Sequence, residues 1–156
     1  MNKVIVEKNN GYAVVSLNRP DSMNALSREL RDDFVAALED CQADEAIRVL
    51  IITGKGKAFS AGFDLKELAA PESGTAAETA DNIIARAMEA FEGPIIGAIN
   101  GHAITGGFEL ALACDVIIAS EQARFADTHA RVGILAGWGL SQRLPRLIGL
   151  SRAKEL

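Results

Sequence analysis

Two glycine-rich segments carry the residue types from which an active site could be built. They are residues 59–64, with the sequence FSAGFD, and residues 104–109, with the sequence ITGGFE. Each follows a β-like run and precedes a helix-like one, so its backbone N–H groups point outward, because the first N–H groups of a helix have no partner within it. If the two turns meet, they can stabilise an oxyanion, with the Glu109 carboxyl group close by as acid or base. This combination predicts an enzyme that acts on a polarised carbonyl group.

Each of these residues also has a purely structural interpretation. Glycines such as Gly62, Gly106 and Gly107 serve tight turns that bind nothing. Glu109, in the first turn of its predicted helix, would gain roughly 0.3–1 kcal/mol from the helix dipole without any catalysis. The rest of that helix, residues 108–113, is apolar, and burial there would raise the pKa of the carboxyl group toward neutrality. These apolar surroundings favour a functional role for Glu109.

Other polar residues are weaker candidates. His129 follows Asp127 in an irregular segment, and Asp127 either orients the imidazole or serves a turn. A nucleophile elbow needs glycine two positions before the serine, and Ala58 stands there before Ser60. Trp138, between two glycines, could line a pocket, but packing over its loop is the interpretation we favour.

The composition is that of an ordinary folded domain with an acidic balance. The 156 residues are 49% hydrophobic and 24% charged, and the formal net charge is −5. Such a chain lacks the clustered basic surface that nucleic acid requires. Lys55, Lys57 and Lys66 flank the first turn, where they could form a local phosphate site or simply be solvated.

The cysteines and the chain termini bear on the compartment. Cys41 and Cys114 fall in apolar patterns and are expected to be buried thiols, which suits a reducing cytoplasm. Only two histidines accompany them, so we expect no metal site. The N-terminus has no secretory core, and the longest uncharged run, residues 93–108, is too short and too interrupted to span a membrane. We therefore expect a cytoplasmic protein with no membrane or nucleic-acid partner.

Strands and helices alternate along the chain, and they must position these groups. A hairpin is predicted around residues 9–11, and an amphipathic helix over 26–41 with Ser27 as its N-cap. The apolar run 49–53 predicts a strand covered on both faces. Residues 54–80 are predicted to be loop-like, with an exposed segment around 71–74. Further strands are expected at 94–99 and 116–119, and helices at about 76–91, 108–113, 140–147 and from 151 onward. The alternation predicts an α/β fold, and we find no internal repeat strong enough for a solenoid.

Four blocks of sequence stand in order along the chain: residues 17–20 with 23–26, 58–68, 99–115, and 124–126 with 142–144. Taken together, they resemble the crotonase, or enoyl-CoA hydratase/isomerase, family. Each block is moderately specific, and the ordered set is very specific. The resemblance covers nearly the whole chain and implies a spiral of ββα units that binds an acyl-CoA thioester.

The resemblance also implies roles for individual residues. By position, the N–H groups of Phe63 and Gly106 would form the oxyanion hole around the thioester oxygen. The substrate and its CoA moiety would be bordered by Ala61, Phe63, Asp64, Leu65, Lys66 and Gly106. Glu109 matches the first of two acidic residues that hydratases use. No separate cofactor is implied, because coenzyme A is part of the substrate.

The chain departs from the family pattern in two respects. His129 stands where the second acidic residue of a hydratase is expected, and it could relay a proton, since an unperturbed imidazole has a pKa near 6.5. Residues 1–156 match the core domain alone, and the C-terminal helices that cover the acyl pocket and build the family's trimer or hexamer would be absent. A piece of this kind is expected to expose apolar surface.

These observations leave several functions open. The first hypothesis is an enoyl-CoA hydratase-like lyase of the β-oxidation type, which adds water to trans-2-enoyl-CoA. The second is double-bond isomerisation or another acyl-CoA reaction through an enolate. A non-catalytic acyl-CoA-binding protein and a nonfunctional gene fragment are the remaining alternatives.

Overall fold

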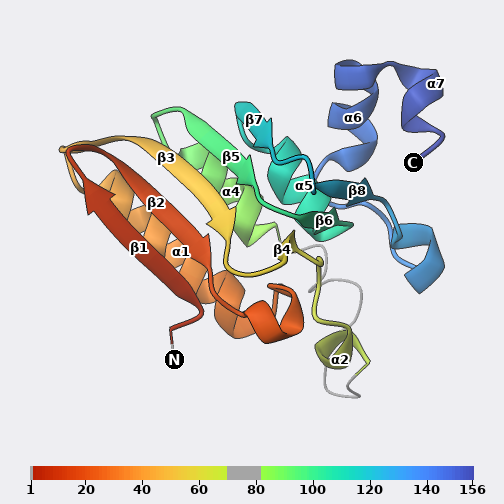
Figure 1. Cartoon of the computed structure of the whole chain (residues 1–156), viewed down its shortest axis with the longest axis horizontal. Helices are drawn as coiled ribbons and strands as arrows, with labels where there is room; N and C mark the ends of the chain where they lie inside the picture. The colour runs from red at the N-terminus through yellow and green to blue at the C-terminus, as the bar shows by residue number, and fades with distance from the viewer. Residues whose placement is uncertain (1, 70–81) are drawn as a thin grey trace.

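The long strands form one sheet, with helices packed on one of its faces. The computed structural model describes residues 2–69 and 82–156. The sheet has the order β1-β2-β3-β5-β7, and only its first pair is antiparallel. Helices α1 and α4 lie side by side against it (Figure 1). The strands are β1 (Val4–Asn9), β2 (Gly11–Leu17), β3 (Ile47–Gly54), β5 (Ile95–Ile99) and β7 (Val116–Ala119), and the two helices are α1 (Arg28–Gln42) and α4 (Ile83–Ala90).

A second sheet of three short parallel strands stands at one end of the first. Each of its strands follows directly on a long strand, and a helix comes after, so the chain repeats the order long strand, short strand, helix (Figure 1). The expectation of an α/β spiral of ββα units is therefore confirmed, and the chain does hold a structural repeat. The short strands are β4 (Ala58–Ser60), β6 (His102–Ile104) and β8 (Arg124–Ala126), and the helices that follow include α2 (Leu65–Leu68), α5 (Gly106–Leu112), α6 (Leu140–Ile148) and α7 (Leu150–Ala153), with 3-10 turns at Pro20–Ser22 and His129–Val132.

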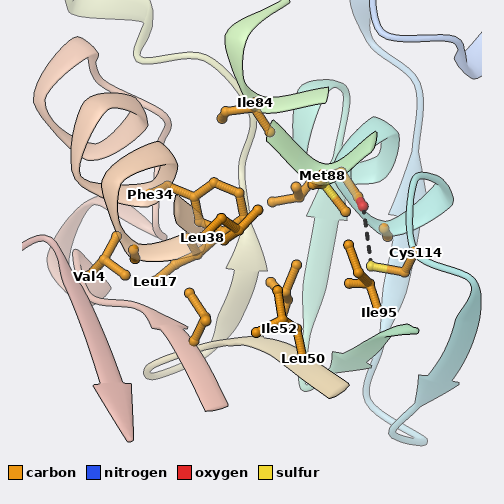
Figure 2. Close-up of a cluster of buried hydrophobic side chains, with 14 of the residues drawn as sticks. Val4, Leu17, Phe34, Leu38, Leu50, Ile52, Ile84, Met88, Ile95 and Cys114 are labelled. Atoms are coloured by element: carbon orange, nitrogen blue, oxygen red, sulfur yellow. Dashed lines mark hydrogen bonds between the residues drawn. The ribbon is translucent and has the colours of Figure 1, made fainter. Parts of the chain in front are cut away.

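The core lies between the large sheet and helices α1 and α4. Phe34 and Leu38 of α1 and Met88 of α4 face Leu50 and Ile52 of β3 (Figure 2). Ser27 caps α1, since its side chain accepts a hydrogen bond from the Leu30 N–H, as the sequence predicted.

Several predictions for single elements need correction. Strand β3 buries only alternate residues, and the other face of the strand is half-buried rather than covered. The segment 54–80 is not only loop, because it contains β4 and α2. Helix α4 begins at Ile83, and the part of its predicted range before residue 82 lies outside the described residues, as does the segment 71–74. Helix α5 begins at Gly106, two residues earlier than expected.

Candidate active site

The two glycine-rich turns leave the same edge of the small sheet. Strands β4 and β6 pair in parallel, with Ser60 opposite Ala103, so the turns that follow them lie next to each other. Gly62 has φ +84°, and a Cβ atom placed there would lie 2.8 Å from the Ile104 carbonyl oxygen and 3.0 Å from the Gly106 nitrogen. Only glycine allows this close approach at this backbone conformation. The expected meeting of the two turns is present.

The turns present two backbone donors to the space beside them. Within residues 2–69 and 82–156, the hydrogen bonds of turns and loops include no acceptor for the N–H of Phe63 or of Gly106. Gly106 is the first residue of α5, where a helix leaves its N–H groups unpaired. Both N–H groups can therefore donate hydrogen bonds to a ligand oxygen.

Thr105 holds the second turn in a strained conformation that the sequence did not reveal. Its φ is 53° and its ψ is −113°, which a β-branched residue rarely adopts. The Thr105 N–H donates to the Ala126 carbonyl oxygen at 2.9 Å, and its hydroxyl group accepts from the Thr128 N–H at 3.2 Å. These bonds to β8 and the segment after it hold the start of α5 in place.

Glu109 is buried at the first turn of α5. Glu109 is only 1% exposed. Its Oε1 accepts hydrogen bonds from the backbone N–H groups of Trp138 at 2.8 Å and Leu140 at 3.2 Å. Burial raises the pKa of Glu109, against the opposing effect of these two donors and of His129. The predicted direction of this pKa shift is confirmed.

His129 connects Glu109 to a second carboxylate. Its Nε2 lies 3.3 Å from Glu109 Oε2, and its Nδ1 lies 2.6 Å from Asp127 Oδ1, which also accepts the His129 backbone N–H at 3.0 Å. Asp127 thus orients the imidazole and favours the proton on Nδ1, which leaves Nε2 to face Glu109. A single proton can then be held between Nε2 and Oε2. The structure brings together the two side chains proposed for catalysis.

An aromatic pair covers the first turn. The rings of Phe63 and Trp138 are 4.9 Å apart between centroids, at an interplanar angle of 55°. The Trp138 ring therefore packs against the first glycine turn rather than only over its own loop, while its backbone N–H donates to Glu109. Arg31 of α1 lies over the Phe63 ring, with 5.4 Å from Cζ to the ring centroid. Sequence analysis missed Arg31, although it follows Leu30 and precedes Phe34 in the apolar pattern of its helix.

The residues proposed to border CoA lie around the start of α2. Ala61 donates its N–H to the Met23 carbonyl oxygen at 2.9 Å, and Asp64 caps α2 by accepting from the Lys66 N–H at 3.1 Å. Burial acts to raise the pKa of Asp64, but the Arg19 guanidinium at 2.9 Å and the Lys66 N–H hold it below its usual value. The side chains of Leu65 and Lys66 are exposed. Of the other two lysines near this turn, Lys55 lies beside Glu7, with 3.6 Å between Nζ and Oε1.

Three further findings concern metal ions, membranes and cavities. Across the described parts of the chain, no group of three or more histidine, cysteine, aspartate or glutamate side chains is arranged to hold a metal ion. None of the helices described there is long and apolar enough to cross a membrane. An apolar cavity of about 540 Å³ lies between α5, β7 and α6, lined by Phe108, Leu112 and Leu144 among others, on a face of α5 different from that of Glu109.

Comparisons with known proteins agree with this geometry. Residues 7–156 match the family model described as enoyl-CoA hydratase/isomerase. The chain is 45% identical to the probable peroxisomal enoyl-CoA hydratase 1 of Arabidopsis thaliana over 152 residues. The matched region covers 97% of this chain and 57% of the relative. It is 38% identical to the short-chain-enoyl-CoA hydratase of Clostridium acetobutylicum, and here the matched region covers 100% of this chain and 61% of the relative.

Solved structures agree in fold as well as sequence. The enoyl-CoA hydratase from Mycobacterium tuberculosis H37Rv superposes with a TM-score of 0.83 at 49% identity, covering 98% of this chain and 64% of that one. The chain thus spans about three-fifths of the length of the relatives it matches. With its ββα spiral, paired glycine turns and matching family model, the chain belongs to the enoyl-CoA hydratase/isomerase family.

Proposed function

We propose that the protein adds water to a trans-2-enoyl-CoA thioester to give a 3-hydroxyacyl-CoA. The observation that carries the proposal is the buried pair of Glu109 and His129, on and beside the helix whose first residue, Gly106, has an N–H with no acceptor among the described residues, as has Phe63. Similarity to relatives named as enoyl-CoA hydratases supports it. In this proposal coenzyme A is part of the substrate, and no other cofactor takes part.

In the proposed reaction the thioester oxygen accepts the N–H groups of Phe63 and Gly106. These donors stabilise the enolate oxygen that forms when a water oxygen bonds to the β-carbon. Glu109 takes the proton that this water loses. The enolate then collapses as its α-carbon takes a proton from the Glu109–His129 pair, so one water is added and no proton is gained or lost overall.

We propose that His129, held by Asp127, takes the part of the second carboxylate expected in a hydratase. In the proposal the imidazole, held by Asp127 at 2.6 Å, supplies the second acid–base group and shares its proton with Glu109. The same pair could instead move a proton between two carbon atoms of the substrate. Isomerisation of a 3-enoyl-CoA is therefore the second candidate function.

The CoA moiety is proposed to lie along the first turn. Ala61 precedes Gly62 and the segment from Asp64 to Lys66 comes shortly after it, and the exposed Lys66 is available to a phosphate group. The family resemblance further suggests a trimer or hexamer in the cytoplasm. Light scattering on the whole protein tests the assembly, and a monomer would contradict it.

Glu109→Gln tests the proposed chemistry. Hydration of crotonyl-CoA by a folded preparation of the whole protein should remove the absorbance of the conjugated enoyl group. Glu109→Gln should lower kcat by roughly 10²–10⁴, because the loss of an acid–base group removes the proton transfer. Glu121→Gln, at an exposed turn, is the matched control and should keep wild-type kcat.

The same assay separates the alternatives. No loss of absorbance with the wild-type protein contradicts hydration. A gain of conjugated absorbance from a 3-enoyl-CoA would then assign isomerisation. Equal binding of CoA esters by wild type and Glu109→Gln with no turnover of either substrate would assign a non-catalytic binding protein.

A further inference from the structure

Arg31 is a buried cation with no counter-charge in the described parts of the chain. It is 9% exposed, on the first turns of α1, beside core residues Leu30 and Phe34. No salt bridge described for residues 2–69 and 82–156 includes Arg31, and its Nε has no hydrogen-bond partner there. Arginine is seldom buried without a partner, because the loss of hydration is costly. Its burial therefore needs a compensating contact.

That contact is the ring of Phe63. The Arg31 Cζ atom lies 5.4 Å from the ring centroid, within the range of a cation–π interaction, which strengthens when the cation is removed from water. Phe63 also packs against the ring of Trp138. The two contacts together fix the direction of the Phe63 side chain.

The Phe63 side chain is an important anchor of the first turn. The helix that follows it, α2, has four residues and buries none of them. On the other side, the Leu26 N–H donates to the Gly62 carbonyl oxygen at 2.8 Å, and Leu26 and Phe63 form an isolated parallel bridge. The Gly62 carbonyl oxygen and the Phe63 N–H belong to one peptide group, so the Leu26 hydrogen bond holds that group at its oxygen. The contacts of the Phe63 ring with Arg31 and Trp138 restrain the rotation of the group that this one bond still allows.

We propose that Arg31 is a positioning residue, whose guanidinium holds the Phe63 ring and thereby keeps the Phe63 N–H aimed at the substrate oxygen. This inference rests on the proposed function, in which that N–H is an oxyanion donor. Arg31 itself touches no reacting atom in this scheme. Its effect passes through Phe63.

A double-mutant cycle tests the path through the ring. Arg31→Met and Phe63→Leu are each expected to lower kcat for crotonyl-CoA about tenfold, with KM changed less than about threefold, because the donor acts mainly on the transition state. The double variant is expected to be no slower than Phe63→Leu alone. If instead the double variant loses about a hundredfold in kcat, the product of the two single losses, the proposal is overturned.

Two further variants separate positioning from folding. Arg31→Lys keeps a cation that can lie over the ring, and should retain kcat within about threefold of wild type. Leu38→Ala, at a buried position further along α1, lowers stability without touching Phe63 and should keep kcat. If Arg31→Lys loses as much activity as Arg31→Met, or if Leu38→Ala loses as much as either, the proposal fails.

A binding measurement distinguishes failure of this inference from failure of the hydratase proposal. Acetoacetyl-CoA, a β-keto thioester, forms an enolate whose ultraviolet absorbance can be followed against pH while it is bound. Aligned oxyanion donors lower the apparent pKa of this bound ligand, and Arg31→Met should raise it. If Arg31→Met leaves the apparent pKa of bound acetoacetyl-CoA unchanged, the proposed role of Arg31 is wrong, whatever reaction the wild type performs. If the apparent pKa rises, the proposal holds even if crotonyl-CoA is not hydrated.

Discussion

The two glycine turns offer the same kind of donor but are held in different ways. The second turn leads into α5, all of whose residues are buried. The first leads into α2, which buries none. The Gly106 N–H is therefore positioned by the core, whereas the Phe63 N–H depends on Leu26, Arg31 and Trp138. We infer that damage to the second turn reduces folding stability, and that damage to the first mainly reduces catalytic geometry.

Gly107→Ala should have the largest effect on stability. Its added Cβ would lie 2.2 Å from the Ser60 carbonyl oxygen and 2.8 Å from the Ser60 carbonyl carbon, so the helix and β4 would have to separate. We expect a loss of about 3 kcal/mol or more in the free energy of unfolding, measured by denaturant titration.

Gly106→Ala is the matched control for this effect. The nearest atom to its added Cβ is the Gly62 Cα at 3.5 Å, an ordinary contact. We expect a change of less than about 1 kcal/mol. Equal stabilities of the two variants would contradict the view that the second turn is held by close packing against β4.

Gly62→Ala should have an intermediate effect on stability and a larger effect on activity. At φ +84° an alanine costs roughly 1–2 kcal/mol, and its Cβ would also press on the Ile104 carbonyl oxygen at 2.8 Å. The neighbouring Phe63 N–H would be displaced, so kcat for crotonyl-CoA should fall about tenfold or more.

Gly149→Ala provides the backbone control. Gly149 has φ +83° and nothing within 4 Å of an added Cβ, so it carries the conformational cost without the contact. At ψ 153° its conformation is one that few residues other than glycine adopt, so Gly149→Ala should lose roughly 1–3 kcal/mol of stability and keep full activity. A loss of kcat as large as that of Gly62→Ala would show that the first turn has no special role.

The pH dependence of stability around Glu109 is the smallest effect we predict. Burial raises the pKa of Glu109 in the folded protein above its ordinary value of 4.5, so the folded state binds this proton more tightly than the unfolded state. This proton therefore stabilises the folded protein fully at pH values below the pKa that Glu109 has in the unfolded chain. The stabilisation is lost as the pH rises through the pKa that Glu109 has in the folded protein.

Glu109→Gln removes this titration. Unfolding titrations from about pH 4 to about pH 8 should show the variant gaining stability relative to wild type as the pH rises. A difference that stays constant, or that falls, would contradict a raised pKa. Such a result would mean that the Glu109 carboxyl group lies in a more polar environment than the structure describes.

Local sequence signals predicted the long elements well. The strands of the large sheet are apolar runs, alternating or continuous, and α1 has both an apolar face and the Ser27 cap. The two turns follow from glycines at the ends of β-like runs. The strands of the small sheet were not predicted individually, because strands of three residues such as β4 and β8 are too short to display a period.

The sequence by itself determined the α/β class, the glycine turns and the presence of Glu109 in an apolar helix, since these depend on residues close together in the chain. Only the tertiary structure decided that the turns lie side by side, that His129, held by Asp127, faces Glu109, and that Arg31 lies over Phe63. These contacts join residues from separate repeats or segments, so their geometry depends on strand pairing and helix packing rather than on local preference.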